Sequence, residues 1–487
     1  MATASTATPL SSNSHRRLLL LSLLFILCFS SDKGFALRAG GEEEALQTHH
    51  HTVQLSSLLP ASTCTPSTQE KKGKASVKVV HWHGPCSTLK QKEATAPTPA
   101  QILSHDQSRV KSIQSQVNSG RSKIDYSQAA TLPAKSGSSI GSPNYIVTVE
   151  LGTPKEDFSL IFDTGSDLTW IQCQPCAVSC YKQKDPIFNP SLSKSYKNVT
   201  CDSSQCSLLT SATGNEPRCS TSTCIYGIKY GDRSSSLGYF ASETLTLTPT
   251  DVFPGFLFGC GENNTGLFNG AAGLLGLGRD KLSLISQTES KYGKYFSYCL
   301  PSTSSGTGHL TFGKGGISGN PKFTTLSINP QGPSFYFITI IAIKVSGKIL
   351  PISQSVFTTA GTIIDSGTVI TRLPPGAYTP LKTAFRQQMT KYRLTYPLSI
   401  LDTCYDLSNY TTVTIPTISF YFAGNTEVPL DLSGILYVAS PSQVCLAFAG
   451  NGHASDLGIF GNVQQQTLDV VYDVAGGKLG FGPGGCS

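Results

Sequence analysis

Two short segments of the chain share one pattern, in which an aspartate, a hydroxyl residue and a glycine follow an apolar run. They are residues 161–165 (IFDTG) and residues 363–367 (IIDSG). An apolar run that ends in such a triplet predicts a buried strand that delivers a carboxylate into a tight turn. One triplet alone is compatible with an aspartate that caps a turn, but the matched pair predicts one site built from two similar halves.

A pair of adjacent carboxylates has a defined chemistry, which makes Asp163 and Asp365 candidate catalytic residues. Two carboxyl groups held a hydrogen bond apart cannot both ionise, so they share one proton, and one pKa falls while the other rises. The ionised group can take a proton from a water molecule, and the protonated group can donate one to an amide oxygen. This chemistry hydrolyses a peptide bond, and it requires neither a metal nor an organic cofactor.

The residues that follow each aspartate are predicted to support it. Gly165 and Gly367 are expected to let the backbone turn sharply beside the carboxylates. Thr164 and Ser366 each place a hydroxyl group where it can hydrogen-bond the facing loop and hold the pair in register.

The sequence of residues 145–170, YIVTVELGTPKEDFSLIFDTGSDLTW, resembles the opening of a pepsin-like aspartic protease, and the similarity extends to the C-terminus. A cysteine-rich insert and residues 81–87 (HWHGPCS) resemble the atypical, nepenthesin-like plant branch, in particular the chloroplast nucleoid DNA-binding aspartic proteases. The resemblance implies an all-β fold of two pseudo-symmetric lobes with a few short helices and a cleft between the lobes. It also implies an acid-active, monomeric endopeptidase whose substrates are proteins or peptides, with apolar side chains preferred around the cleaved bond.

An internal repeat supports the two-lobed interpretation. Residues 145–149 (YIVTV) correspond to residues 336–340 (YFITI), and an aspartate loop follows each of them. Residues 273–276 (GLLG) correspond to residues 458–461 (GIFG), an element that in the family threads beside the aspartate loop of its own lobe. Helices are expected only at residues 100–117, 281–290 and 375–389, and in the last of these four apolar residues form a packing face: Ala377, Leu381, Phe385 and Met389.

Four consecutive regions are predicted along the chain. Residues 1–36 contain a basic pair and a short apolar run, which is typical of a signal peptide for secretion. Their first 15 residues are rich in Ser, Thr and Ala and lack acids, so a plastid transit peptide is the alternative. The remaining regions are a prosegment (37–135), an N-terminal catalytic lobe (136–332) with a cysteine-rich insert (173–224), and a C-terminal catalytic lobe (333–487).

The net charge of +7 is confined to the region before the lobes. Residues 1–135 hold 15 Lys and Arg against 8 Asp and Glu, whereas residues 136–487 hold 22 of each. Lys71, Lys72, Lys74 and Lys78 are expected to lie across an acidic cleft at neutral pH and to leave it in acid. DNA binding through this basic region and a solvated tail are the alternatives. No segment after the leader is long and apolar enough to span a membrane.

Cysteine usage predicts an oxidising compartment. Of the 15 cysteines, Cys64 and Cys86 lie in the predicted prosegment, and an even set in the lobes predicts six disulfides. A zinc knuckle is the alternative for the insert, and the pairing of Cys404 with Cys445 is expected. The twelve candidates are Cys173, Cys176, Cys180, Cys201, Cys206, Cys219, Cys224, Cys260, Cys299, Cys404, Cys445 and Cys486.

A strand, a glycine-bearing turn and a returning strand follow the insert, within residues 224–247. By resemblance this hairpin is the flap over the cleft, Tyr230 is the flap tyrosine, and Trp170 is its hydrogen-bonding neighbour. Tyr226 is the competing assignment. Three Asn-x-Thr sequences are candidate glycosylation sites: Asn198, Asn263 and Asn409.

A binding protein is the main alternative to an enzyme. Some plant relatives keep this fold as inhibitors of foreign enzymes after losing the aspartate pair or its geometry. Both aspartate loops are intact in this chain, which favours the endopeptidase.

Overall fold

The computed structural model describes residues 49–59, 61–67, 75–89, 97–118, 145–230, 234–266, 268, 270–315, 319–484 and 486. All of them belong to one compact unit, His49–Ser487. The predicted signal peptide, the basic residues Lys71, Lys72 and Lys74, and residues 119–144 lie outside the described residues.

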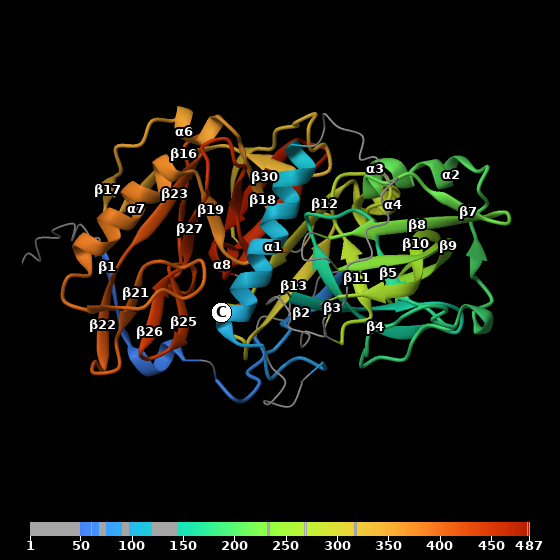
Figure 1. The fold of residues 1–487 in the computed structure, drawn as a ribbon, viewed down its shortest axis with the longest axis horizontal. Helices are drawn as coiled ribbons and strands as arrows, with labels where there is room; N and C mark the ends of the chain where they lie inside the picture. Colours follow the sequence, from blue (N-terminus) through green and yellow to red (C-terminus); the bar gives the residue numbers. More distant parts are fainter. Residues whose placement is uncertain are drawn as a thin grey trace, which may run out of the picture. The chain divides into compact units, whose positions relative to one another are not determined.

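Most of the described residues form β-strands, as the short alternating apolar runs predict, and Figure 1 shows two groups of strands with few helices. The largest sheet has 15 strands and includes strands from both lobes. In order across the sheet they are β14 (Lys322–Thr325), β30 (Lys478–Gly482), β29 (Asp469–Asp473), β12 (Tyr295–Cys299), β13 (Thr307–Phe312), β2 (Ser76–His81), β3 (Tyr145–Leu151), β4 (Glu156–Asp163), β11 (Gly273–Gly276), β5 (Trp170–Gln172), β10 (Asp251–Thr265), β9 (Ser235–Thr248), β8 (Thr223–Lys229) and β7 (Arg218–Ser220), with β6 (Lys197–Asn198) paired to β9.

The C-terminal lobe contains three smaller sheets, and a two-stranded sheet joins it to the N-terminal part of the chain. Their strands, in sheet order, are β15 (Tyr336–Ile338), β18 (Thr362–Ile364), β28 (Gly458–Phe460), β19 (Thr371–Leu373) and β27 (Phe448–Gly450); β17 (Lys348–Ile349), β16 (Ile340–Val345), β23 (Ile418–Phe422) and β24 (Thr426–Pro429); β20 (Arg393–Thr395), β21 (Cys404–Asp406), β26 (Gln443–Leu446) and β25 (Leu436–Ser440); and β1 (His50–Gln54) with β22 (Thr412–Pro416).

The two aspartate loops follow equivalent strands, so the predicted internal repeat is confirmed. Strand β4 ends at Asp163 and pairs antiparallel with β3 and parallel with β11. Strand β18 ends one residue before Asp365 and pairs antiparallel with β15 and parallel with β28. The residues just before each aspartate, Phe162 and Ile364, are apolar and buried, so each aspartate follows a buried strand, as predicted.

Two of the predicted helices form as expected, and the third is divided. Helix α7 (Pro375–Gln388) buries Ala377, Leu381 and Phe385 of the predicted apolar face, and Met389, one residue past its end, is buried as well. Residues 281–290 form two single turns, α4 (Leu284–Gln287) and α5 (Glu289–Tyr292), because Thr288 between them leaves the helical conformation. The other short helices are α2 (Ser204–Ser207), α3 (Leu209–Thr213), α6 (Ser355–Thr358), α8 (Asn462–Gln465) and the 3-10 turns η1 (Leu55–Leu58), η3 (Pro190–Leu192) and η4 (Leu432–Gly434).

The described residues before the lobes, 49–59, 61–67, 75–89 and 97–118, are called the N-terminal segment below. This segment packs on the lobes in three places. Strand β1 pairs with β22 of the C-terminal lobe, and β2 lies between β13 and β3 in the large sheet. Helix α1 (Pro99–Asn118) lies between the two lobes, where Figure 1 shows it in cyan. Lys78, which was expected in the cleft, is exposed on β2 opposite His309 of β13 instead.

Apolar contacts hold α1 against the C-terminal lobe. Leu103 is fully buried in a cluster with Val369 and Ile370. Val110, Ile113 and Val117 are buried in a second cluster with five residues of that lobe: Phe335, Phe337, Ile363, Leu457 and Ile459. Each buried side chain of this size contributes about 1.5–3 kcal/mol.

All twelve predicted cysteines form six disulfides, and the expected pair Cys404–Cys445 is confirmed. The cysteines of the insert are therefore not free to bind zinc. A seventh disulfide closes a loop within the N-terminal segment, between Cys64 and Cys86. The remaining five are Cys173–Cys260, Cys176–Cys180, Cys201–Cys219, Cys206–Cys224 and Cys299–Cys486.

Candidate active site

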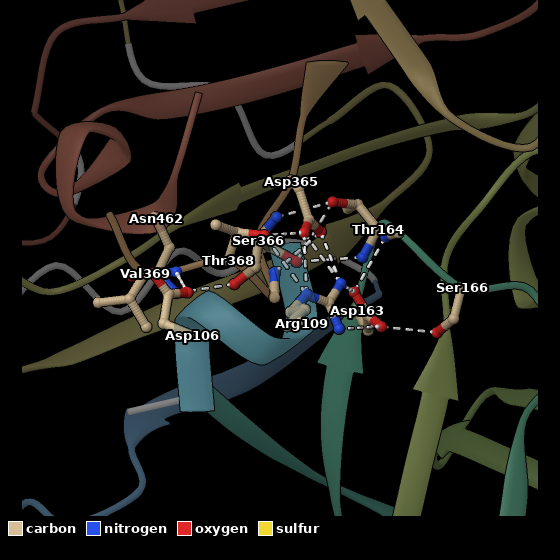
Figure 2. Close-up of polar contacts among 12 residues, drawn as sticks. Asp106, Arg109, Asp163, Thr164, Ser166, Asp365, Ser366, Thr368, Val369 and Asn462 are labelled. Carbon is tan, nitrogen blue, oxygen red and sulfur yellow. Dashed lines mark hydrogen bonds and ion pairs between the residues drawn. The ribbon is translucent and has the colours of Figure 1, made fainter. Parts of the chain in front are cut away.

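The two aspartate loops meet between the lobes, where each loop hydrogen-bonds the other (Figure 2). The backbone N–H of Ser366 donates to Oγ1 of Thr164 at 2.9 Å, and the N–H of Thr164 donates to Oγ of Ser366 at 3.1 Å. Both side chains are buried, so these bonds are protected from water. The reciprocal pair fixes the distance between the two loops.

Gly165 and Gly367 each face the carboxylate of the opposite loop. A Cβ atom at Gly165 would lie 2.8 Å from Oδ1 of Asp365, and one at Gly367 would lie 2.5 Å from Oδ1 of Asp163. Neither glycine has a positive φ. Both glycines lie in turns, as the sequence predicted, and lack of space beside the opposite carboxylate is a further reason for glycine at these positions.

The two carboxylates have matching surroundings. Asp163 is 1% exposed and accepts hydrogen bonds from the N–H of Gly165 at 2.9 Å and the hydroxyl of Ser166 at 2.8 Å. Asp365 is fully buried and accepts from the N–H of Gly367 at 3.0 Å and the hydroxyl of Thr368 at 2.5 Å. The sequence analysis did not single out the two hydroxyl residues. Their signal was a second hydroxyl residue three positions after each aspartate.

The largest feature that the sequence analysis missed is Arg109, whose guanidinium group lies between the carboxylates (Figure 2). Its Nη2 lies 2.7 Å from Oδ1 of Asp163 and 2.9 Å from Oδ2 of Asp365. Its Nη1 donates to Oδ2 of Asp163 at 3.2 Å, and its Nε donates to Oδ2 of Asp365 at 3.1 Å. The side chain is 22% exposed. Arg109 lies four residues before the buried Ile113, at the edge of the apolar face of α1, and this position alone does not distinguish it from an arginine that faces solvent.

The charges of this cluster shift the pKa values of its members in different directions. Burial acts to raise the pKa of Asp163, but the Arg109 charge and the hydrogen bonds of Gly165 and Ser166 outweigh it, and the pKa lies below its ordinary value. Burial raises the pKa of Asp365 above its ordinary value, and the Asp163 charge adds to this effect against the opposing influence of Arg109. Despite burial, the two carboxylates raise the pKa of Arg109, so it stays charged. A split of this kind is suited to a pair in which one carboxyl group is ionised and the other protonated.

The structure places the two candidate flap residues in contact. The indole Nε1 of Trp170 donates a hydrogen bond to the hydroxyl of Tyr230 at 2.8 Å. Tyr230 lies at the turn end of the β8–β9 hairpin, and its ring packs edge-on against Phe268 at 5.8 Å. Tyr226 is fully buried, and its hydroxyl hydrogen-bonds Ser236. Tyr226 therefore lies in the core of the lobe, whereas Tyr230 is partly buried at the turn end of the hairpin, and its role as the flap tyrosine stays a prediction.

The remaining predicted sites lie away from the carboxylates. Asn198 and Asn409 are exposed, and Asn263 is partly buried in β10. Among the described residues, no three His, Cys, Asp or Glu side chains are close enough to hold a metal ion. In the same part of the chain, no helix has both the length and the apolarity needed to cross a membrane.

Comparisons with known proteins show the family of this chain. The family model "Xylanase inhibitor N-terminal" matches residues 145–314, and "Xylanase inhibitor C-terminal" matches residues 335–483. An aspartyl protease family protein of Arabidopsis thaliana is 57% identical over 472 residues, which cover 96% of this chain and 99% of that protein. The aspartic proteinase nepenthesin-2 of Nepenthes gracilis is 40% identical over 358 residues, 71% of this chain and 78% of that protein.

Among solved structures, the crystal structure of edgp has the same fold. It aligns with a TM-score of 0.59 at 23% identity, and the alignment covers 70% of this chain and 92% of that chain. Fold, paired aspartate loops and relatives lead to one conclusion: the chain belongs to the atypical, nepenthesin-like family of plant aspartic proteases.

Proposed function

We propose that this chain is the precursor of an aspartic endopeptidase that hydrolyses peptide bonds in proteins. The observation that carries the proposal is the position of one atom, Nη2 of Arg109, within hydrogen-bond distance of both Asp163 and Asp365. A water oxygen in that position would be hydrogen-bonded by both carboxylates. Relatives named aspartyl proteases support the same activity.

The proposed reaction uses one shared proton. After Arg109 has left, the ionised carboxylate takes a proton from the water as its oxygen attacks the peptide carbonyl carbon, and the protonated carboxyl group donates its proton to the carbonyl oxygen. The tetrahedral intermediate then collapses, the C–N bond breaks, and a proton passes to the leaving amine. Once Arg109 has left, its effect on both pKa values is lost, and Asp163 and Asp365 share one proton between them.

We further propose that residues 1–36 are a signal peptide and residues 37–135 a prosegment, followed by the lobes 136–332 and 333–487. The N-terminal segment supports this division because α1 occupies the position between the aspartates that a substrate needs. Because Arg109 holds the pKa of Asp163 below its ordinary value, their ion pair is complete above the ordinary pKa and is lost as the pH falls through the lowered value. Acid therefore weakens the block, which fits a zymogen with an acid optimum.

The proposed compartment is extracellular or vacuolar, reached through the secretory route. Seven disulfides support an oxidising environment. The likeness to chloroplast nucleoid DNA-binding proteases stays a prediction, and it would imply import into plastids. A fluorescent fusion of residues 1–60 distinguishes secretion from plastid import, because import into plastids would refute secretion.

The test of the enzyme proposal compares the full-length chain with its Asp365→Asn variant on an unfolded protein substrate at about pH 4, near the pKa of carboxyl groups. We expect only the wild type to lose its N-terminal segment and to cleave the substrate, and pepstatin to block the cleavage. If both proteins stay inert after another protease has removed the segment, the proposal fails. A catalytically silent, inhibitor-like binding protein would then be the better interpretation.

A further inference from the structure

A second buried ion pair joins α1 to the C-terminal lobe, close to the aspartates. Nη2 of Arg372, on β19, lies 2.9 Å from Oδ2 of Asp106. Asp106 is fully buried, and Arg372 is 1% exposed. The backbone N–H groups of Val369 and Ile370 also donate to the Asp106 carboxylate, at 2.6 and 3.2 Å. Figure 2 shows Asp106 against Val369, next to the aspartate loops.

The partners of Arg372 are divided unevenly between the lobe and α1. From the lobe, the carbonyl oxygen of Ile370 accepts from Nη1 at 2.7 Å. From α1, Asp106 and Gln107 accept from Nη2, at 2.9 and 3.3 Å. The Nε atom is buried and has no hydrogen-bond partner. Among the described residues, Asp106 is the one carboxylate that pairs with this guanidinium group.

Departure of α1 removes the anion from Arg372 and from two backbone donors, and it also uncovers the guanidinium group, because the 1% exposure of Arg372 includes the cover that α1 gives. A substrate that covers this site again would leave the charge without a partner, at a cost, unless the substrate brings an anion of the same kind. Asp106 lies three residues before Arg109 on the helix, about 4.5 Å along its axis. An extended peptide rises about 3.3 Å per residue, so the site lies within about two residues of the cleaved bond.

We propose that Arg372, together with the N–H groups of Val369 and Ile370, forms a substrate subsite for an aspartate or glutamate side chain, which Asp106 occupies in the intact chain. This inference rests on the proposed endopeptidase activity. It assigns to the processed enzyme a preference for an acidic residue next to the cleaved bond, on the side of the C-terminal lobe. Arg109 blocks the reacting groups, whereas Asp106 imitates part of the substrate.

The test uses the full-length chain after its N-terminal segment has been removed by acid or by another protease. The probes are fluorogenic peptides in which one position at a time, up to two residues on either side of the cleaved bond, is Glu or Gln. At pH 5, above the ordinary pKa of a glutamate, we expect kcat/KM to be at least tenfold higher for Glu at one position. The variant Arg372→Gln should lose this ratio, and Arg372→Lys should keep most of it.

The charge swap gives the sharpest comparison. In the double variant Arg372→Glu with Asp106→Lys, the charges are reversed but the Val369 and Ile370 N–H groups lose their acceptor, so the processed enzyme should lose its Glu preference and favour Gln over Glu at the same position. A wild type without a Glu preference would overturn the inference even if no variant folds. An equal Glu to Gln ratio in the wild type and in a folded, active Arg372→Gln protein would also overturn it, while the endopeptidase proposal would stand.

A binding measurement separates the inference from the enzyme proposal. A labelled peptide of residues 97–118 and its Asp106→Asn form are titrated against the processed protein, and fluorescence anisotropy reports binding without turnover. On the wild-type protein, we expect the Asn peptide to bind at least tenfold more weakly than the unchanged peptide. On the Arg372→Gln protein, we expect the two peptides to bind equally well. If the processed protein cleaves nothing, this difference still supports the anionic subsite, and its absence overturns it.

Discussion

Replacement of Arg109 by methionine should open the cleft of the intact chain without removing α1. Arg109 makes charge-assisted hydrogen bonds to two buried carboxylates, and its loss leaves these groups without the partner that neutralises them. Loss of one member of a buried ion pair typically costs about 3–5 kcal/mol. We take about 3 kcal/mol, because the side chain is 22% exposed and the two carboxyl groups can share a proton once the arginine is gone.

The free-energy cost of about 3 kcal/mol can be converted into a change in the fraction of open chains, those in which α1 has left the lobes. The buried apolar residues of α1, Leu103, Val110, Ile113 and Val117, still contribute about 1.5–3 kcal/mol each, so the helix stays on the lobe most of the time. A change of about 3 kcal/mol raises the open fraction roughly 100-fold, and the apparent Kd of a cleft ligand falls by the same factor.

The assay is calorimetric titration of the freshly purified, uncleaved chain with pepstatin at pH 6 and low temperature, with gels before and after to show that the chain is intact. Lys111→Met is the matched control, because Lys111 is an exposed cation on the same helix. We expect Arg109→Met to bind pepstatin about 100-fold more tightly than either the wild type or this control. Equal affinity of all three proteins would refute the role of Arg109 as a block.

Three further predictions concern pH and the flap. Burial lowers the pKa of His81 to about 3 and that of His83 to about 4, so both favour the docked N-terminal segment above about pH 6.5 and lose that contribution as the pH falls toward these values. Replacement of both by glutamine should shift acid processing, followed on gels across a pH series, to lower pH; an unchanged midpoint would count against this trigger. Burial raises the pKa of Asp167 to about 7, so its contribution to stability is complete below about pH 4 and is lost as the pH rises through 7. Calorimetry of Asp167→Asn should show a loss of stability between pH 4 and pH 7 that is smaller than in the wild type by up to about 4 kcal/mol, and an equal loss in both proteins would contradict the assignment. Tyr230→Phe removes the acceptor of the buried Trp170 N–H and should lower kcat/KM of the processed enzyme about tenfold, whereas an unchanged value would argue against the flap.

Much of the fold could be predicted from the sequence because it depends on patterns between near neighbours. The aspartate loops, the alternating strands and the apolar face of α7 are each visible within a few residues. The even cysteine set predicted six disulfides, and all six form. Their partners, apart from the one expected pair, followed only from the folded chain, where Cys299 meets Cys486 across a sequence separation of 187.

In the candidate site too, some residues could be predicted from their near neighbours and others only from the folded chain. The local sequence predicts Asp163 and Asp365, and it also predicts the hydroxyl residue beside each. It does not predict Arg109, because a lone arginine on a half-polar helix looks the same whether it faces solvent or a pair of carboxylates. The charge of the basic cluster around Lys78 predicted a place in the cleft, yet Lys78 lies on β2, which pairs with β13 on one side and β3 on the other.

The sequence by itself determined the two-lobed β fold, the paired carboxylates and the disulfide-rich character of this protein. Only the tertiary structure decided which cation lies between the carboxylates and which carboxylate meets Arg372. These contacts join one helix to both lobes, and the partners lie 54 positions apart for Arg109 and Asp163, 256 for Arg109 and Asp365, and 266 for Asp106 and Arg372. Such pairings depend on how packed elements bring charges together in space, and no spacing along the chain records them.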